Sequence, residues 1–205
     1  MSKVLSKTEQ DRLFFLGYHL AFESSSKRKN RRNIFASWRA AAESGHKRAQ
    51  FYLGTCYDNG LGVDKNVAEA FKWYMKAARQ HHPDAQYNIA CFYDRGEVVK
   101  QDDKKAAKWY TLAAEQGDIA SQRNLGVCYI YGRGVKEDHE QAVYWYKKAA
   151  QQYDALALYN LGLCYKLGQG VQVSYRWARH YFEKAESLGH KKAKRQLLEL
   201  AKLQK

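Results

Sequence analysis

The chain has 205 residues, of which 45% are apolar, and its formal net charge is +14 at pH 7. It contains no run approaching the roughly 18 apolar residues of a membrane span, so we expect no transmembrane helix. The start of the chain also lacks the apolar run and cleavage site of a signal peptide, which favours a cytoplasmic protein.

A repeat with a period of 36 residues runs through most of the chain. Repeats 2, 3, 4 and 5 align in phase as residues 49–84, 85–120, 121–156 and 157–192. Self-similarity at a fixed period indicates structural units that stack and touch mainly their neighbours. We therefore expect one all-α domain, residues 1–205, built as an α-solenoid of antiparallel helix pairs.

Residues 1–48 form a divergent first repeat. The pair Leu16-Gly17 takes the place of the Leu-Gly pair in later repeats, and the stretch from Trp38 onward matches their second helix. The intervening loop, residues 24–33, carries five basic residues: Lys27, Arg28, Lys29, Arg31 and Arg32. Such a basic run is compatible both with an anion-binding site and with a solvated loop.

Each later repeat begins with a helix that carries one small residue in a fixed place. Leucine or isoleucine precedes it and tyrosine follows three positions later, so these side chains share one helical face. A glycine here lowers helix propensity by up to about 1 kcal/mol, and we expect it to allow close approach of a neighbouring helix. The small residues are Gly54, Ala90, Gly126 and Gly162.

A glycine-rich turn and a capped second helix complete each repeat. Paired glycines such as Gly132 and Gly134 end the first helix and permit positive φ, whereas repeat 3 has Val98 at the second position. The second helix carries alanines and aromatic residues on one face. Residues typical of helix N-caps precede it: Asn66, Asp102, Asp138 and Ser174.

These columns resemble the Sel1-like repeats, which are relatives of the tetratricopeptide repeats. The resemblance is clear over residues 49–192 and is strongest at 157–162 (ALYNLG) and 147–150 (KKAA). It implies a right-handed superhelix of about five repeats, with residues 193–205 as a C-terminal capping helix. It also implies a non-catalytic scaffold or adaptor for protein–protein interaction. Some similar bacterial proteins neutralise toxins as immunity proteins or assist host interaction.

A concave surface made by the first helices is the predicted site for a peptide or a partner domain, if these helices line the inner wall as in tetratricopeptide relatives. Aromatic residues and arginine are enriched at binding hot spots, and asparagine can hydrogen-bond a peptide backbone. Alternatively, the amides bond a neighbouring helix and the aromatics fill the space between repeats. The predicted residues are Phe51, Tyr87, Arg123 and Tyr159, the amide column Asn88, Asn124 and Asn160, and, one turn on, Asp94, Arg95 and Tyr131.

Positive charge is concentrated at the two ends of the chain. Residues 1–48 hold 11 Lys and Arg against 4 Asp and Glu, residues 157–205 hold 10 against 3, and the middle is neutral. Basic ends are an alternative binding site for nucleic acid or for an acidic partner. They also have a simpler explanation, which is that like charges keep exposed repeat ends from stacking on one another.

The sequence contains no motif for catalysis or cofactor binding. Ligand spacings such as Cys-x-x-Cys and His-Glu-x-x-His are absent, as is a P-loop, so we expect no metal, no cofactor and no enzyme activity. The cysteines lie on the first helices of successive repeats, about 10 Å apart in a helical stack, which is too far for a disulfide. We expect buried structural thiols at Cys56, Cys91, Cys128 and Cys164.

Overall fold

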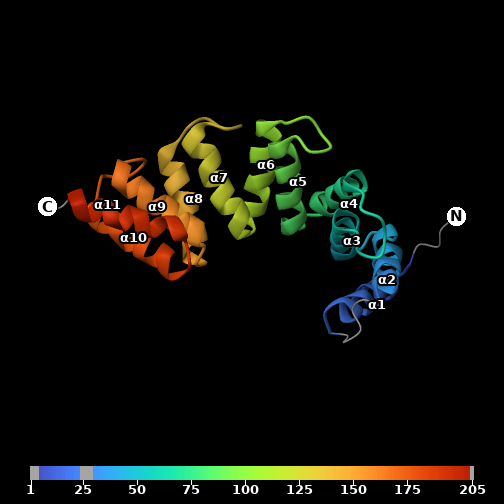
Figure 1. Ribbon diagram of the computed structural model, residues 1–205. Coiled ribbons are helices and arrows are strands. Elements are labelled where there is room, and N and C mark those ends of the chain that lie inside the picture. The colour runs from blue at the N-terminus through green and yellow to red at the C-terminus, as the bar shows by residue number, and fades with distance from the viewer. Residues whose placement is uncertain (1–4, 24–29, 204–205) are drawn as a thin grey trace. The chain divides into compact units, whose positions relative to one another are not determined.

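The computed structural model describes residues 5–23 and 30–203, and within these ranges it contains eleven α-helices, one π-helical turn and no β-strand (Figure 1). This confirms the predicted all-α class. The helices up to residue 101 are α1 (Lys7–Tyr18), continued by the π-helical turn His19–Glu23, α2 (Arg31–Glu43), α3 (Lys47–Asn59), α4 (Val67–Arg79) and α5 (Pro83–Arg95). Those that follow are α6 (Asp103–Glu115), α7 (Ile119–Tyr131), α8 (His139–Gln151), α9 (Ala155–Leu167), α10 (Tyr175–Ser187) and α11 (Lys191–Leu203).

The chain divides into two compact units, Met1–Gln101 and Asp102–Lys205. Within each unit every helix packs against its neighbours in the chain, from α1 to α5 in the first unit and from α6 to α11 in the second. This is the packing of stacked antiparallel helix pairs, as predicted. We call the first helix of each pair the A helix (α1, α3, α5, α7 and α9) and the second the B helix (α2, α4, α6, α8 and α10).

Side-chain caps fix where most of the helices begin. The B helices α4, α6, α8 and α10 follow an extended residue whose side chain accepts a hydrogen bond from the backbone N–H three positions later. Asn66 Oδ1, for example, accepts from the Glu69 amide at 3.0 Å. Such a cap satisfies one of the backbone donors left open at a helix start. The N-cap column expected from the sequence is therefore present in the structure.

The small residue of the A helix lies against an aromatic ring of its own B helix. A Cβ placed on Gly126 would come within 2.5 Å of the Tyr146 ring, and one placed on Gly54 within 2.7 Å of the Tyr74 ring. The same contact joins Gly17 to Trp38 in the first repeat. The glycines thus provide the close helix approach that the sequence predicts.

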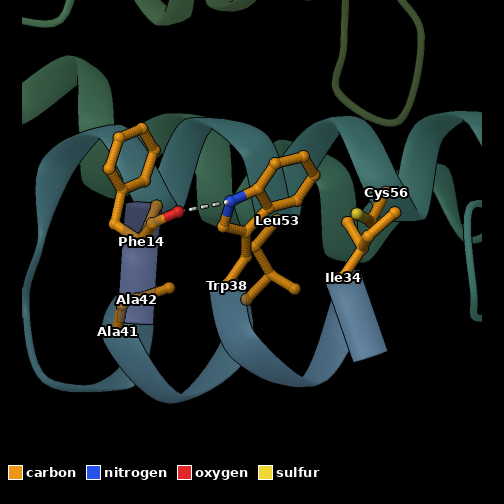
Figure 2. Packing of buried hydrophobic residues seen from close by; sticks show 8 residues of the cluster. Phe14, Ile34, Trp38, Ala41, Ala42, Leu53 and Cys56 are labelled. Carbon is orange, nitrogen blue, oxygen red and sulfur yellow. Dashed lines mark hydrogen bonds between the residues drawn. The ribbon is translucent and has the colours of Figure 1, made fainter. Parts of the chain in front are cut away.

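The first repeat shows how this contact builds the core (Figure 2). Trp38 of α2 is almost fully buried between α1 and α3, and its indole Nε1–H donates a hydrogen bond to the Phe14 carbonyl oxygen at 3.3 Å. Phe14, Ile34 and Leu53 complete the apolar cluster around it. The divergent first repeat therefore shares the glycine-to-aromatic contact of the later ones, although Leu16 is 48% exposed and its counterpart Leu53 is buried.

The turn after the A helix of repeat 3 has a strained backbone, unlike the corresponding turns of the other repeats. The second turn glycine has positive φ in the other repeats, as at Gly62 (75°) and Gly134 (72°). Val98 occupies this place in repeat 3 with φ of 66°, a region in which a β-branched residue is strained. The substitution noted in the sequence thus costs backbone energy without changing the helices on either side.

Substitution of Gly126 by alanine is expected to destabilise the protein. The added methyl group overlaps the Tyr146 ring, and overpacking of this kind costs about 1–3 kcal/mol, against a gain of about 1 kcal/mol in helix propensity. Urea denaturation should show a net loss of about 1 kcal/mol for Gly126→Ala. In the Tyr146→Leu background the same change should be neutral or stabilising. Equal effects in both backgrounds would contradict the contact.

Substitution of Val98 by glycine is expected to stabilise the protein. Left-handed backbone costs a non-glycine residue roughly 1–2 kcal/mol, which exceeds the gain in unfolded-chain entropy from glycine of about 0.5–1 kcal/mol. The free energy of unfolding should therefore rise by several tenths of a kcal/mol or more. The neighbouring change Val99→Gly is the control and should destabilise, because Val99 does not have positive φ.

Candidate protein-binding surfaces

Two aromatic residues of the A helices stack on the histidine that directly precedes the next A-type helix. The Phe51 ring lies 4.6 Å from the His82 ring with 16° between their planes, and Tyr159 lies 4.3 Å from His190. Both histidines directly precede the following A-type helix, α5 and α11 respectively. These two predicted site residues therefore contact the residue that precedes the next A-type helix, within their own unit.

Arg123 makes the equivalent contact by charge. Its guanidinium Nη1 lies 2.7 Å from Oδ2 of Asp154, the N-cap of α9, and the two side chains are only 19% and 14% exposed. Phe14 in the first repeat repeats the aromatic version, with the His46 ring at 4.8 Å. One position thus links successive A helices by ring stacking or by an ion pair.

Buried histidines at these caps are held neutral. Burial, together with the positive charges of Lys47 and Arg48, lowers the pKa of His82 to about 4. Burial also lowers the pKa of His46, although the nearby Asp11 carboxylate opposes this effect. A neutral imidazole suits the position, because His46 Nδ1 accepts a hydrogen bond from the Ala49 amide at 3.1 Å. The cap and the ring stack therefore depend on the uncharged form.

The amide column lies half-buried beside this contact. Asn160 is hydrogen-bonded to Tyr146 of the preceding B helix, so its side chain joins two helices. Asn88 lines a hollow of about 140 Å³ in the first unit, together with Asp58 and Arg95. The structure thus brings Asn88 and Arg95 together. Asn124 lies half-buried on α7.

The last residues of α3, α5, α7 and α9 are exposed to solvent, whereas Tyr18 at the end of α1 is half-buried. Arg95 is exposed and lies 3.9 Å from the Glu97 carboxylate, and Tyr131 is 69% exposed. Their equivalents Asn59 and Leu167 are exposed as well. Asp94, one residue earlier on α5, is half-buried, as is Tyr87. Among the predicted residues, Arg95 and Tyr131 are therefore the most accessible to a partner.

The basic loop lies mostly outside the described residues. Lys27, Arg28 and Lys29 fall in the segment 24–29 that the structure does not describe. Arg31 and Arg32 begin α2, where both side chains are exposed. These two arginines are accessible to an anionic partner in the first unit.

The four cysteines are free thiols, of which Cys56, Cys128 and Cys164 are buried as predicted, whereas Cys91 is only partly buried. Burial raises the pKa of Cys56 to about 12 and that of Cys164 to about 11, so both stay protonated at neutral pH. Within residues 5–23 and 30–203, no cluster of three His, Cys, Asp or Glu residues is arranged to hold a metal ion. None of the helices in this part of the chain has the length and hydropathy to cross a membrane.

A family model described as the Sel1 repeat matches four consecutive segments, residues 47–82, 83–118, 119–154 and 155–190. The chain belongs to the Sel1 repeat family. Proteins of this family generally mediate protein–protein interaction and are generally non-catalytic. Each matched segment begins at or near an A helix and ends just before the next one.

Several solved structures are similar to the chain. A Sel1 repeat protein from Oxalobacter formigenes is 36% identical, with a TM-score of 0.80 over 90% of this chain and 75% of that one. A protective antigen of uropathogenic Escherichia coli strains is 34% identical, with a TM-score of 0.87 over 94% of this chain and 41% of that one. An immunity protein from Pseudomonas aeruginosa is 26% identical, with a TM-score of 0.55 over 92% and 69%.

One curated protein shares a short segment with the chain. DAP3-binding cell death enhancer 1 of Rattus norvegicus is 50% identical over 34 residues, which is 17% of this chain and 7% of that protein. The length of this match is close to that of one repeat, so the likeness concerns the repeat itself.

The sequence did not reveal the cap residues that complete the contacts between A helices. His82, Asp154 and His190 each lie 31 positions after their partners Phe51, Arg123 and Tyr159. That constant offset is the signal in the sequence. The offset can be interpreted as a contact between successive A helices only when the way in which these helices stack is known.

Stability is expected to fall in mild acid because of His82. Its folded pKa of about 4 lies below the ordinary value of 6.5, so the unfolded chain binds a proton first as the pH falls. The contribution is complete above about pH 6.5 and is lost between pH 6.5 and 4. The variant His82→Asn has no imidazole and so does not lose stability in this way. The difference in the free energy of unfolding between the unmodified protein and His82→Asn should therefore be about 2 kcal/mol smaller at pH 5 than at pH 7. Phe51→Leu is the control, since it removes the same ring contact but keeps the imidazole and its pH dependence. Equal costs of His82→Asn at the two pH values would contradict the assignment.

Proposed function

We propose that this protein is a non-catalytic scaffold or adaptor that binds a peptide or a domain of a partner protein on the face of its A helices. Membership of the Sel1 repeat family supports the protein-binding role. We choose this surface because the residues at the C-terminal ends of α3, α5, α7 and α9 are exposed. Arg95 and Tyr131 in this column are residue types enriched at binding hot spots.

Two roles are proposed for the predicted site residues. Phe51, Arg123 and Tyr159 hold successive A helices in place, and the neighbouring residues contact the partner. The contacting set is Tyr87, Asn88, Asn124, Asn160, Asp94, Arg95 and Tyr131. A surface fixed by such contacts before binding loses little conformational freedom when the partner docks, which favours affinity. Free cysteine thiols support a reducing compartment, and we place the interaction in the cytoplasm.

Two narrower alternatives remain. The net positive charge of both chain ends, with Arg31 and Arg32 exposed on α2, favours an anionic partner such as nucleic acid or an acidic protein. The similarity to the Pseudomonas aeruginosa immunity protein favours a role of that kind. The partner recovered from cells distinguishes these alternatives from the scaffold proposal.

Affinity capture from the lysate of the native host, at low and high salt and with mass spectrometry, tests the proposed surface. A distinct protein partner should survive high salt and be lost on the double change Arg95→Ala and Tyr131→Ala. The matched control is Tyr175→Ala with Arg176→Ala, which changes the same residue types at exposed positions of α10.

Equal capture by both double variants would contradict the A-helix surface. Recovery of nucleic acid and ribosomal proteins alone, removed by salt, would instead assign the function to the basic ends, because phosphate contacts are strongly salt-dependent.

A further inference from the structure

A pair of glutamines closes the junction between successive repeats. In the second unit, Gln152 Nε2 donates hydrogen bonds to Gln122 Oε1 at 3.0 Å and to the Gly117 carbonyl oxygen at 3.1 Å. Gln122 in turn donates to the Ala114 carbonyl oxygen at 3.1 Å. These bonds connect the ends of B helices α6 and α8 to the A helix α7 between them.

The first unit contains the same pair. Gln80 Nε2 donates to Gln50 Oε1 at 2.8 Å and to the Gly45 carbonyl oxygen at 3.0 Å, and Gln50 donates to the Ala42 carbonyl oxygen at 3.2 Å. The arrangement therefore occurs once in each unit, and its bonds to the Ala42 and Ala114 carbonyl oxygens satisfy buried backbone groups.

The last repeat junction replaces both glutamines by leucines. Counting 36 residues forward from Gln122 and Gln152 leads to Leu158 and Leu188. Leu158 is buried, whereas Leu188 is 45% exposed. A leucine at either place cannot make the amide hydrogen bonds, so this junction has an apolar surface where the others are polar.

A hollow of about 500 Å³ lies at this junction, between α8, α9 and α10. Leu158, Leu161 and Ala150 form its apolar floor, and Tyr153, Tyr181 and Leu188 stand around it. The equivalent hollow one repeat earlier measures about 330 Å³ and is lined by Gln122 and Glu115. The later hollow thus differs from its counterpart in size and in polarity, and its volume is within the range of about 300–1,000 Å³ that is usual for ligand sites.

Tyr153 adds a strained aromatic side chain to the edge of the hollow. It has φ of 61° and is 78% exposed, at a position where the preceding repeat has Gly117 with φ of 94°. Left-handed backbone is unfavourable for tyrosine and easy for glycine. An exposed ring held at such a position does not contribute to the core, and it enlarges the surface available to a partner.

The charge around the hollow is positive. Among the described residues that line it, Lys147 and Lys184 are charged and none is acidic. Both lysines are exposed, and neither forms an ion pair within the described part of the chain. The counterpart hollow has Lys148 and Glu115 instead, so its charges balance.

We propose that the hollow between α8, α9 and α10 binds an acidic peptide segment of a partner protein, with one large apolar side chain of that segment seated on Leu158 and its carboxylates paired with Lys147 and Lys184. The proposal rests on the protein-binding function above and names the chemistry of the partner. The apolar floor supplies the buried anchor typical of a hot spot, and the two lysines select acidic flanking residues.

Selection from a display library of random peptides of about 12 residues, with the full chain as bait, tests this proposal. Selected peptides should combine an aromatic or large aliphatic residue with neighbouring Asp or Glu. Their affinity should fall at least about tenfold for the double change Leu158→Gln and Leu188→Gln, which introduces the amide pair that the chain uses at Gln50 with Gln80 and at Gln122 with Gln152. The matched control Leu16→Gln with Leu198→Gln alters exposed leucines outside the hollow and outside the A-helix column, and it should change affinity less than about twofold.

A second variant separates binding from folding. Tyr153→Gly should weaken peptide binding by about fivefold while raising the melting temperature, since it removes both the exposed ring and the backbone strain. The charge reversals Lys147→Glu and Lys184→Glu should abolish binding of the acidic peptides. No selected peptide, a basic consensus, or unchanged affinity in the leucine-to-glutamine variant would each overturn the proposal.

The lysate capture described above distinguishes failure of the hollow from failure of the proposed function. A partner captured equally well by the Leu158→Gln and Leu188→Gln variant would overturn the hollow and leave the A-helix surface in place. Selected peptides that bind the hollow, with no partner dependent on Arg95 and Tyr131, would support the hollow while contradicting the A-helix surface.

Discussion

The contact between a glycine of the A helix and an aromatic ring of the B helix is the constraint on which the repeats with Gly17, Gly54, Gly126 and Gly162 depend. At Gly54 and Gly126 the tyrosine ring rests directly on the helix backbone, so this contact sets the distance between the two helices of the pair. The N-cap side chains fix where the B helices begin, and the glycine turns fix where the A helices end. Each repeat is therefore specified by few residues, and they recur in phase.

A second set of contacts joins each A helix to the residue that caps the next A-type helix. Ring stacking of Phe51 on His82 and the ion pair of Arg123 with Asp154 occupy the same place in their units, although their chemistry differs. The shared requirement is a side chain that fills the space above the next helix N-terminus and tolerates its partly positive end. Neutral histidine and ionised aspartate both meet it. This explains how one column can hold aromatic and charged residues without disturbing the stack.

The sequence predicted the helices, turns and caps well because these depend on local patterns. It predicted less about the site, because the columns Phe51 to Tyr159 and Asn88 to Asn160 look alike whether they face a groove or a neighbouring repeat. Asn160 bonds Tyr146, and Tyr159 stacks on His190, contacts that depend on the angle between repeats. The change from Gln122 and Gln152 to Leu158 and Leu188 was visible in the aligned repeats. Its meaning required the hydrogen bonds that the glutamines make.

The recurring glycines of the A helices hold the fold together, and residues such as Arg95, Tyr131, Tyr153 and Leu188, which differ between repeats, are the ones we connect with recognition. Titration of the isotope-labelled full chain with a captured partner or a selected peptide, followed through backbone amide NMR signals, tests this division directly. The account predicts the largest shifts at the varying positions Arg95, Tyr131, Tyr153 and Leu188, with small shifts at Gly54 and Gly126. The largest shifts at the recurring glycines, with none at the varying positions, would contradict it.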